Sequence, residues 1–141
     1  MGQVKMSERV DAAPAEAWAV MADLSRLGDW LTLHAGWRSD VPVLATGVEL
    51  VAIVAAKGVR NKITWVVGEL DPPHRLCLDG HGVGGTEVVL DMALRSDGAG
   101  SIFEVEIDFA HPTLKGPLGS LAARTVRTEL TRSLERFREL V

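Results

Sequence analysis

The stretch TEVVLDMALRSDGAGSIFEVEIDFA, residues 86–110, decides the fold class of this chain. Apolar and polar residues alternate on both sides of a turn at Ser96–Gly100, which is typical of two half-buried antiparallel strands joined as a hairpin. The alternation predicts that Leu90 and Phe103 face inward, together with the other apolar residues of the same parity. One face of this hairpin must therefore be covered by another element of the chain.

The C-terminal residues supply that cover. Pro112 ends the second strand, and the pattern is helical from about Leu114 to Leu140. At 100° per residue, one side of this helix carries an apolar stripe made of Leu118, Ala122, Val126, Leu130, Phe137 and Leu140. We expect one long helix lying against the inner face of the sheet.

The remaining segments add strands and two short helices. Strands are predicted at Val4–Val10, Val48–Ala56, Val59–Leu70 and Arg75–Leu78, short helices at Ala15–Met21 and Leu24–Trp30, and a loop at Thr32–Gly47. Asp11 offers a signal for the start of the first helix. Strands that are joined mostly by hairpins form an antiparallel sheet, so we predict an α+β fold. It is a curved antiparallel sheet wrapped around a long C-terminal helix, with two short helices after the first strand, in a single domain of residues 1–141.

Composition and charge exclude several classes of function. The chain has 141 residues, a formal charge of −4 and one cysteine, Cys77. A net acidic chain lacks the field that drives sequence-independent binding to nucleic acid. No apolar run reaches the ~20 residues that span a bilayer, and a lone cysteine suits a reducing compartment. We expect a cytoplasmic protein with no nucleic-acid partner and no membrane insertion.

Element order and several motifs resemble the START-like, Bet v 1-like superfamily of helix-grip proteins, which covers polyketide cyclase/dehydrase and lipid transport proteins. The opening Val10–Trp18 (VDAAPAEAW) is common there. A narrower resemblance is to an actinobacterial branch described as toxins of type II toxin–antitoxin pairs. It rests on the segments WLTLH (30–34), WRS (37–39), KG (57–58), NKITW (61–65), GHGVGG (80–85) and GPLG (116–119).

The resemblance implies a cavity between sheet and helix rather than one particular reaction, because a fold alone does not select a function. We expect the cavity wall to be formed by Ile53, Ile63, Trp65, Leu90, Phe103, Val126 and Leu130, with Trp30 and His34 near its mouth. Asn61 either orients a ligand among apolar neighbours or bonds the backbone of a turn. Trp30 and Trp65 are either pocket wall or core.

Two histidines are candidates for proton transfer, His34 and His81, because imidazole titrates near neutral pH. Histidine spacing predicts no metal site. The glycines at Gly80–Gly85 lie between strands, so they lack the helix that a phosphate loop needs, and no cofactor is expected. On the last helix, Thr125, Glu129, Arg132 and Arg136 form a polar edge, either an exposed margin with Glu129 paired to Arg132 or a site for an acidic ligand group.

Four functions follow from these features. The first is binding of a small hydrophobic molecule, lipid or polyketide-like, by a monomer or homodimer with no catalysis or only weak catalysis. The second is a cyclase or aromatase in which His34 or His81 moves a proton and Asn61 holds a carbonyl. The third is a toxin-like protein with a protein partner. The fourth is self-sacrifice resistance to an enediyne, in which Gly82, Gly84 or Gly85 is cleaved.

Overall fold

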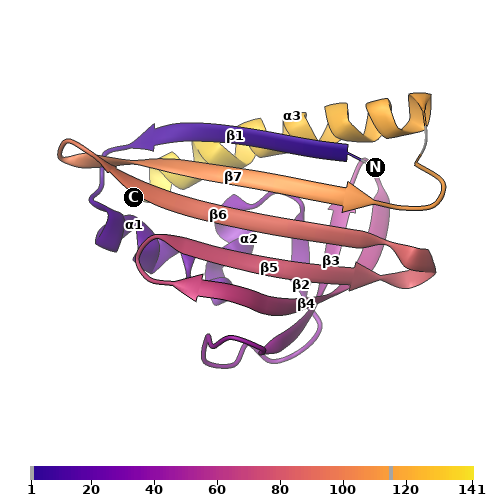
Figure 1. The fold of residues 1–141 in the computed structure, drawn as a ribbon, viewed down its shortest axis with the longest axis horizontal. Helices are drawn as coiled ribbons and strands as arrows, with labels where there is room; N and C mark the ends of the chain where they lie inside the picture. The colour runs from indigo at the N-terminus through magenta and orange to yellow at the C-terminus, as the bar shows by residue number, and fades with distance from the viewer. Residues whose placement is uncertain (1, 115) are drawn as a thin grey trace.

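The computed structural model describes residues 2–114 and 116–141 and confirms the α+β helix-grip fold. Seven antiparallel strands form one sheet in the order β1-β7-β6-β5-β4-β3-β2 (Figure 1). The strands are β1 (Gly2–Val10), β2 (His34–Trp37), β3 (Glu49–Ala56), β4 (Val59–Asp71), β5 (Arg75–Gly82), β6 (Glu87–Asp97) and β7 (Gly100–Ala110). The helices are α1 (Pro14–Met21), the 3₁₀ turn η1 (Leu24–Arg26), α2 (Leu27–Trp30), the 3₁₀ turn η2 (Val83–Gly85) and α3 (Pro117–Leu140).

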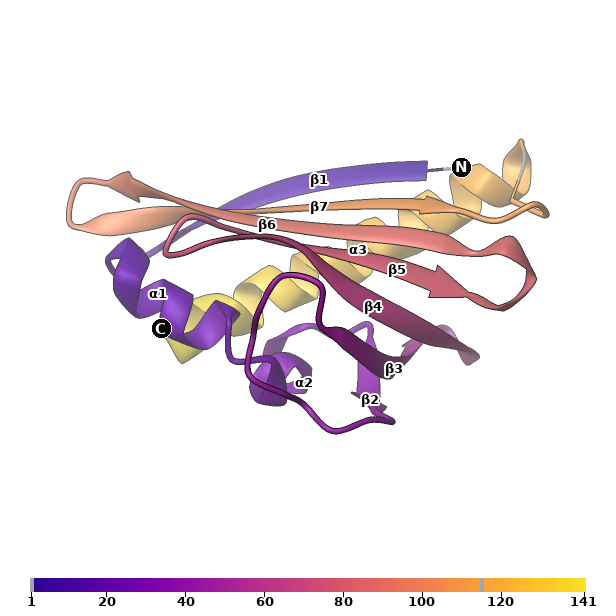
Figure 2. The same ribbon diagram turned by 60° about the horizontal axis from the view of Figure 1, so that its bottom comes forward.

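The alternation in β6 and β7 sets the inner face of the sheet. Leu90 pairs with Ile107 and Leu94 with Phe103, and all four side chains are buried. Because side chains in a strand alternate between faces, the acidic residues between them lie on the outer face. α3 crosses the concave inner face of the sheet (Figure 2).

The C-terminal half of α3 closes a solid core. Phe137 stacks on Phe103 with ring centroids 4.0 Å apart, and the Trp30 indole meets both rings edge-on. All three side chains have no exposed surface, and neither has Leu130. These large rings fill the space between helix and sheet at this end of the molecule.

A hydrogen-bond cluster fixes α2 to α3. The Thr32 hydroxyl donates to the Glu129 carboxylate at 2.6 Å, and the Thr32 backbone N–H donates to Ser133 Oγ at 3.0 Å. Ser133 is fully buried and its hydroxyl also donates to the Glu129 carbonyl at 2.8 Å. Buried hydroxyls require such partners, so this contact sets how the chain after α2 meets the helix.

Several expected boundaries need correction. α3 begins at Pro117 rather than near Leu114, and position 115 of the expected helix lies outside the described residues. The expected loop at 32–47 contains β2, and β5 continues through Gly82. The residue before α1 is Ala13, whereas Asp11 pairs with Arg9. Short strands and strand ends depend on pairing with a neighbouring strand, which the local sequence pattern does not report.

Candidate ligand-binding site

A cavity of about 440 Å³ lies between the inner face of the sheet and the N-terminal half of α3. Its volume falls within the range of roughly 300–1,000 Å³ that is usual for small-molecule sites. The cavity and the aromatic core share one interior. At the C-terminal half of α3 aromatic rings fill it, and at the N-terminal half it is hollow.

The deep wall of the cavity is apolar. It is formed by Leu31, Leu33, Trp65, Leu90 and Ile107, each of which is buried. Val126 and Ala122 of α3 close the opposite side. A wall of this composition binds hydrocarbon or aromatic surface through burial.

The mouth of the cavity is framed by the β3–β4 hairpin. Lys57 and Gly58 form its two-residue turn with φ of 48° and 79°, which is the left-handed pair that a type I′ turn needs. Lys57, Val59 and Asn61 all line the cavity and are exposed. Across the opening, Leu118 and Leu121 of α3 line the cavity and are also more than half exposed.

Three further polar side chains lie in the lining: Thr86, His111 and Thr125. The Thr113 backbone N–H donates to His111 Nδ1 at 3.1 Å, so Nδ1 is an acceptor and the neutral ring carries its proton on Nε2. The Thr86 hydroxyl donates to the Val83 carbonyl at 3.0 Å. Of the polar side chains in the lining, Lys57, Asn61, Thr86 and His111 lie at or near strand ends and turns, whereas Thr125 lies on α3, where its hydroxyl donates to the Leu121 carbonyl at 3.1 Å.

Glycine on β5 makes room for the Trp65 indole. Trp65 pairs with Gly80, and a Cβ on Gly80 would lie 2.8 Å from Cε3 and Cζ3 of the indole. The indole Nε1 is buried and has no hydrogen-bond partner among the described residues. Trp65 therefore contributes mainly apolar ring surface to the wall.

The structure brings four of the ten expected ligand-binding residues to the cavity: Asn61, Trp65, Leu90 and Val126. Trp30, Phe103 and Leu130 lie in the solid core, so their expected place at the pocket is corrected. Ile63 is buried beside Gly80 and Gly82 but does not line the cavity. Ile53 pairs with Lys62, so its side chain lies on the outer face of the sheet. The next residue, Val54, pairs with Asn61 and lines the cavity instead.

Neither candidate proton carrier lines the cavity. The His34 ring packs against Trp37 with centroids 4.6 Å apart, and burial lowers its pKa below the ordinary histidine value. Its Nδ1 is buried and has no hydrogen-bond partner in the part of the chain that the structure describes. His81 is exposed and pairs with Thr64, whose neighbours Ile63 and Trp65 face inward. The structure therefore supplies no support for either ring as a proton shuttle. Gly82, Gly84 and Gly85 are likewise outside the lining.

Some lining residues were missed by sequence reasoning although a signal was present. The parity that turns Phe109 inward also turns His111 inward, and the parity of Val88 turns Thr86 inward. Leu31 and Leu33 had no such signal, because they lie in or beside the segment that was expected to be loop. On the polar edge of α3, Glu129 pairs with Arg132 at 3.8 Å, as one of the two interpretations predicted.

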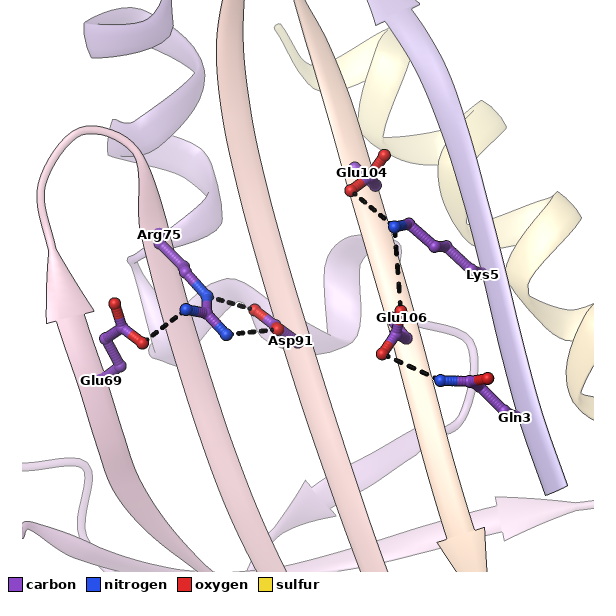
Figure 3. Close-up of polar contacts among 7 residues, drawn as sticks. All are labelled: Gln3, Lys5, Glu69, Arg75, Asp91, Glu104 and Glu106. Carbon is purple, nitrogen blue, oxygen red and sulfur yellow. Dashed lines mark hydrogen bonds and ion pairs between the residues drawn. The ribbon is translucent and has the colours of Figure 1, made fainter.

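The outer face of the sheet is polar and internally paired (Figure 3). Arg75 binds Asp91 through Nη2 at 2.7 Å and Glu69 through Nη1 at 2.6 Å. Lys5 contacts Glu104 at 3.4 Å and Glu106 at 4.0 Å. A small hollow of about 220 Å³ lies among these residues, but its charges already pair with one another. The inner cavity is therefore the site with capacity for a ligand.

The described residues contain neither a metal-ligand cluster nor a membrane-spanning helix. In residues 2–114 and 116–141, no three His, Cys, Asp or Glu side chains are grouped so that they could hold a metal ion. No described helix is long and apolar enough to cross a bilayer.

Comparison with known proteins identifies the family. Residues 1–141 match the family model described as "Polyketide cyclase / dehydrase and lipid transport". The chain belongs to this family. Its members share a fold that binds hydrophobic ligands, in agreement with the apolar cavity described above.

Two relatives from Mycobacterium tuberculosis (strain H37Rv) match nearly the whole chain. "Uncharacterized protein Rv1546" is 40% identical over 141 residues, 99% of each chain. "Toxin Rv0910" is 36% identical over 138 residues, 97% of this chain and 96% of the relative. Among solved structures, TTHA0849 from Thermus thermophilus has a TM-score of 0.78 at 16% identity and covers 98% of this chain and 95% of its own. That likeness supports the fold alone.

Proposed function

We propose that this family member binds one small amphipathic molecule, lipid or polyketide-like, with its apolar body in the cavity and its polar end at the mouth. The observation that carries the proposal is the division of the lining. Its buried wall is apolar, whereas Lys57 and Asn61 are exposed on the hairpin that frames the opening. A ligand that entered polar end first would bury that end against a mostly apolar wall, away from water and from Lys57 and Asn61, which is costly.

The chemistry of the mouth favours an acidic or hydrogen-bonding end. The Lys57 ammonium has no ion-pair partner among the described residues, and Asn61 supplies both a donor and an acceptor. A carboxylate at this position would stay near water and gain a hydrogen bond to a charged group. His34 and His81 lie outside the lining, so neither ring is placed to act on a bound molecule.

The decisive experiment is a titration with straight-chain fatty acids of increasing length, read by displacement of a fluorescent fatty acid. Each buried CH₂ contributes about 0.8 kcal/mol, so the affinity should rise roughly fourfold per carbon until the cavity is full. The corresponding alcohols should bind more weakly, and Lys57→Gln should remove that difference. An affinity that does not depend on chain length would overturn the proposal.

A matched pair of variants separates the cavity from the rest of α3. Ala122 lines the cavity, whereas Thr128 lies on the exposed side of the same helix. Ala122→Leu should shorten the longest chain that the cavity accepts, because added volume displaces ligand volume. Thr128→Leu should leave the chain-length profile unchanged.

Native mass spectrometry of freshly purified protein would identify a molecule that copurifies.

A toxin role is the second candidate, and one observation favours it. The relative named Toxin Rv0910 is 36% identical over nearly the whole chain. Inducible expression in a mycobacterial host tests this role. Growth arrest that Ala122→Leu relieves would connect toxicity to the cavity, whereas unimpaired growth at high expression would remove the candidate.

A further inference from the structure

Exposed apolar side chains gather at the mouth of the cavity. Among the described residues, five large hydrophobic side chains are exposed: Val43, Val59, Val83, Leu118 and Leu121. Four of them surround the mouth, and only Val43 lies elsewhere, in the segment between β2 and β3. Scattered exposed apolar residues are ordinary, but a group around an opening indicates an interaction surface.

Val83 belongs to this group through its neighbours in η2. Its carbonyl accepts the hydrogen bond from the cavity-lining Thr86. A Cβ on Gly84 would lie 3.5 Å from Nε2 of His111, and a Cβ on Gly85 would lie 3.4 Å from Pro112. The β5–β6 connection, the end of β7 and the start of α3 lie at one end of the molecule (Figure 1). We call the four exposed apolar residues Val59, Val83, Leu118 and Leu121 the rim.

Positive charge accompanies the rim, although the whole chain has a formal charge of −4. The described parts of the segments that frame the mouth, 56–62, 82–87 and 110–126, contain the basic residues Lys57, Arg60, Lys62 and Arg124 and the acidic residue Glu87. All four basic side chains are exposed, and none has an ion-pair partner among the described residues. Asn61 faces the cavity, so Arg60 and Lys62 extend from the other face of the same hairpin.

We propose that the rim and its basic residues dock end-on against an anionic lipid surface. Apolar side chains that enter the boundary between headgroups and acyl chains, flanked by Lys and Arg, are the features that bind peripheral proteins to such surfaces. The exposed apolar residues of the rim are valine and leucine, whereas the apolar anchors of protein-binding hot spots are enriched in tryptophan and tyrosine. In this orientation the mouth opens toward the lipid, so a poorly soluble ligand of the kind proposed above would pass between bilayer and cavity without crossing water.

The test is sedimentation of the full chain with vesicles. Phosphatidylcholine vesicles are compared with vesicles of equal parts phosphatidylcholine and phosphatidylglycerol, at low and high salt. We expect binding to the anionic vesicles that weakens as salt rises, because screening shortens the reach of the basic side chains. Equal binding to both vesicle types, or no binding to either, would overturn the proposal.

A matched pair of triple variants locates the docking surface. Arg60, Lys62 and Val83 lie at the mouth but outside the cavity lining, and Arg60→Gln, Lys62→Gln and Val83→Ser together should weaken anionic-vesicle binding at least tenfold. Arg38→Gln, Val43→Ser and Arg95→Gln remove the same number of positive charges and the same valine side chain elsewhere and should alter it less than twofold. Equal losses in both triples would overturn the proposal. If the first triple variant does not fold, vesicle binding by Val83→Ser alone and the salt dependence of the unmodified chain test the same surface. Val83→Ser should weaken binding to anionic vesicles.

Two controls separate this inference from its rivals. Fatty-acid binding without vesicles should survive the first triple, because its three residues lie outside the cavity lining. An unmodified chain that binds fatty acid but no vesicles refutes only docking, and one that binds anionic vesicles but no fatty acid refutes only the proposed function. Sedimentation velocity without vesicles tests whether a second copy of the chain, rather than a lipid surface, covers the rim. Self-association that the first triple abolishes would identify the rim as a protein interface and overturn lipid docking.

Discussion

The Trp65 indole lies across Gly80 of the neighbouring strand, at a distance where a single methyl group would collide with it. A Cβ on Gly80 would stand 2.8 Å from Cε3 and Cζ3 of the indole and 2.8 Å from Cγ2 of Ile63. The missing side chain on β5 therefore lets two large side chains of β4 lie flat on the inner face. The cavity wall owes its shape to this contact.

Gly80→Ala should consequently destabilise the protein by about 1–3 kcal/mol, because the methyl group overpacks the site. Urea unfolding measures this change. Gly28→Ala is the matched control, since its added Cβ meets only His34 at an ordinary 3.4 Å and alanine favours a helix. If Gly80→Ala is as stable as the original chain, the indole has another position available and the described wall is not rigid.

Thr32→Val should destabilise the protein by about 1–2 kcal/mol. The substitution preserves shape but removes the 2.6 Å bond to Glu129 and leaves that half-buried carboxylate without this donor. Thr128→Val makes the same change on the exposed side of α3 and should stay within about 0.5 kcal/mol. Equal effects in thermal unfolding would show that the α2–α3 cluster contributes nothing specific.

His34 should make stability fall as the solution is acidified. Burial lowers its pKa below the ordinary value of 6.5, so below that pH the unfolded chain binds a proton that the folded chain does not. Stability is therefore full above about pH 6.5 and declines as pH falls toward the lowered pKa. His34→Gln should flatten the profile of unfolding free energy in this window, whereas Thr128→Val should retain its slope. An unchanged slope in His34→Gln would assign the acid sensitivity to other groups.

Ligand binding should depend on Trp65 far more than on His34. Trp65→Ala removes ring surface from the cavity wall and should weaken a fluorescent fatty acid more than tenfold. His34→Ala should weaken it less than tenfold, because His34 lies outside the lining. Fluorescence titration of both variants measures this difference. Turnover of a polyketide-like substrate that His34→Ala abolishes while binding persists would contradict the binding function.

Cys77 should be a slowly reacting thiol. Burial and the nearby Asp91 carboxylate raise its pKa to about 11, so at neutral pH it holds on the order of 100-fold less thiolate than an ordinary cysteine. Its reaction with a disulfide reagent should be slower at neutral pH, and should accelerate as pH rises toward 11. Addition of urea should restore the ordinary rate. Complete reaction of the folded protein within seconds at pH 7 would contradict the burial of this side chain.

The local pattern of the sequence determined the element types and the inner face of the long strands. Alternation from Thr86 to Ala110 fixed which side chains of β6 and β7 face inward, because the two faces of a strand differ by one residue. The apolar stripe of the last helix likewise fixed the face that Leu130 and Phe137 present to the sheet. Both patterns depend only on neighbouring residues in the sequence, so they can be recognised without knowing how distant segments pack.

Only the tertiary structure decided where the interior is filled and where it is hollow. Trp30, Phe103 and Phe137 come from segments far apart in the sequence, and their meeting closes one half of the interior. Leu118 carries the same apolar character as Phe137 on the same stripe, yet it is 56% exposed at the mouth of the cavity. Hydrophobic pattern reports which face turns inward, whereas occupied volume depends on the sizes of side chains brought together from distant elements.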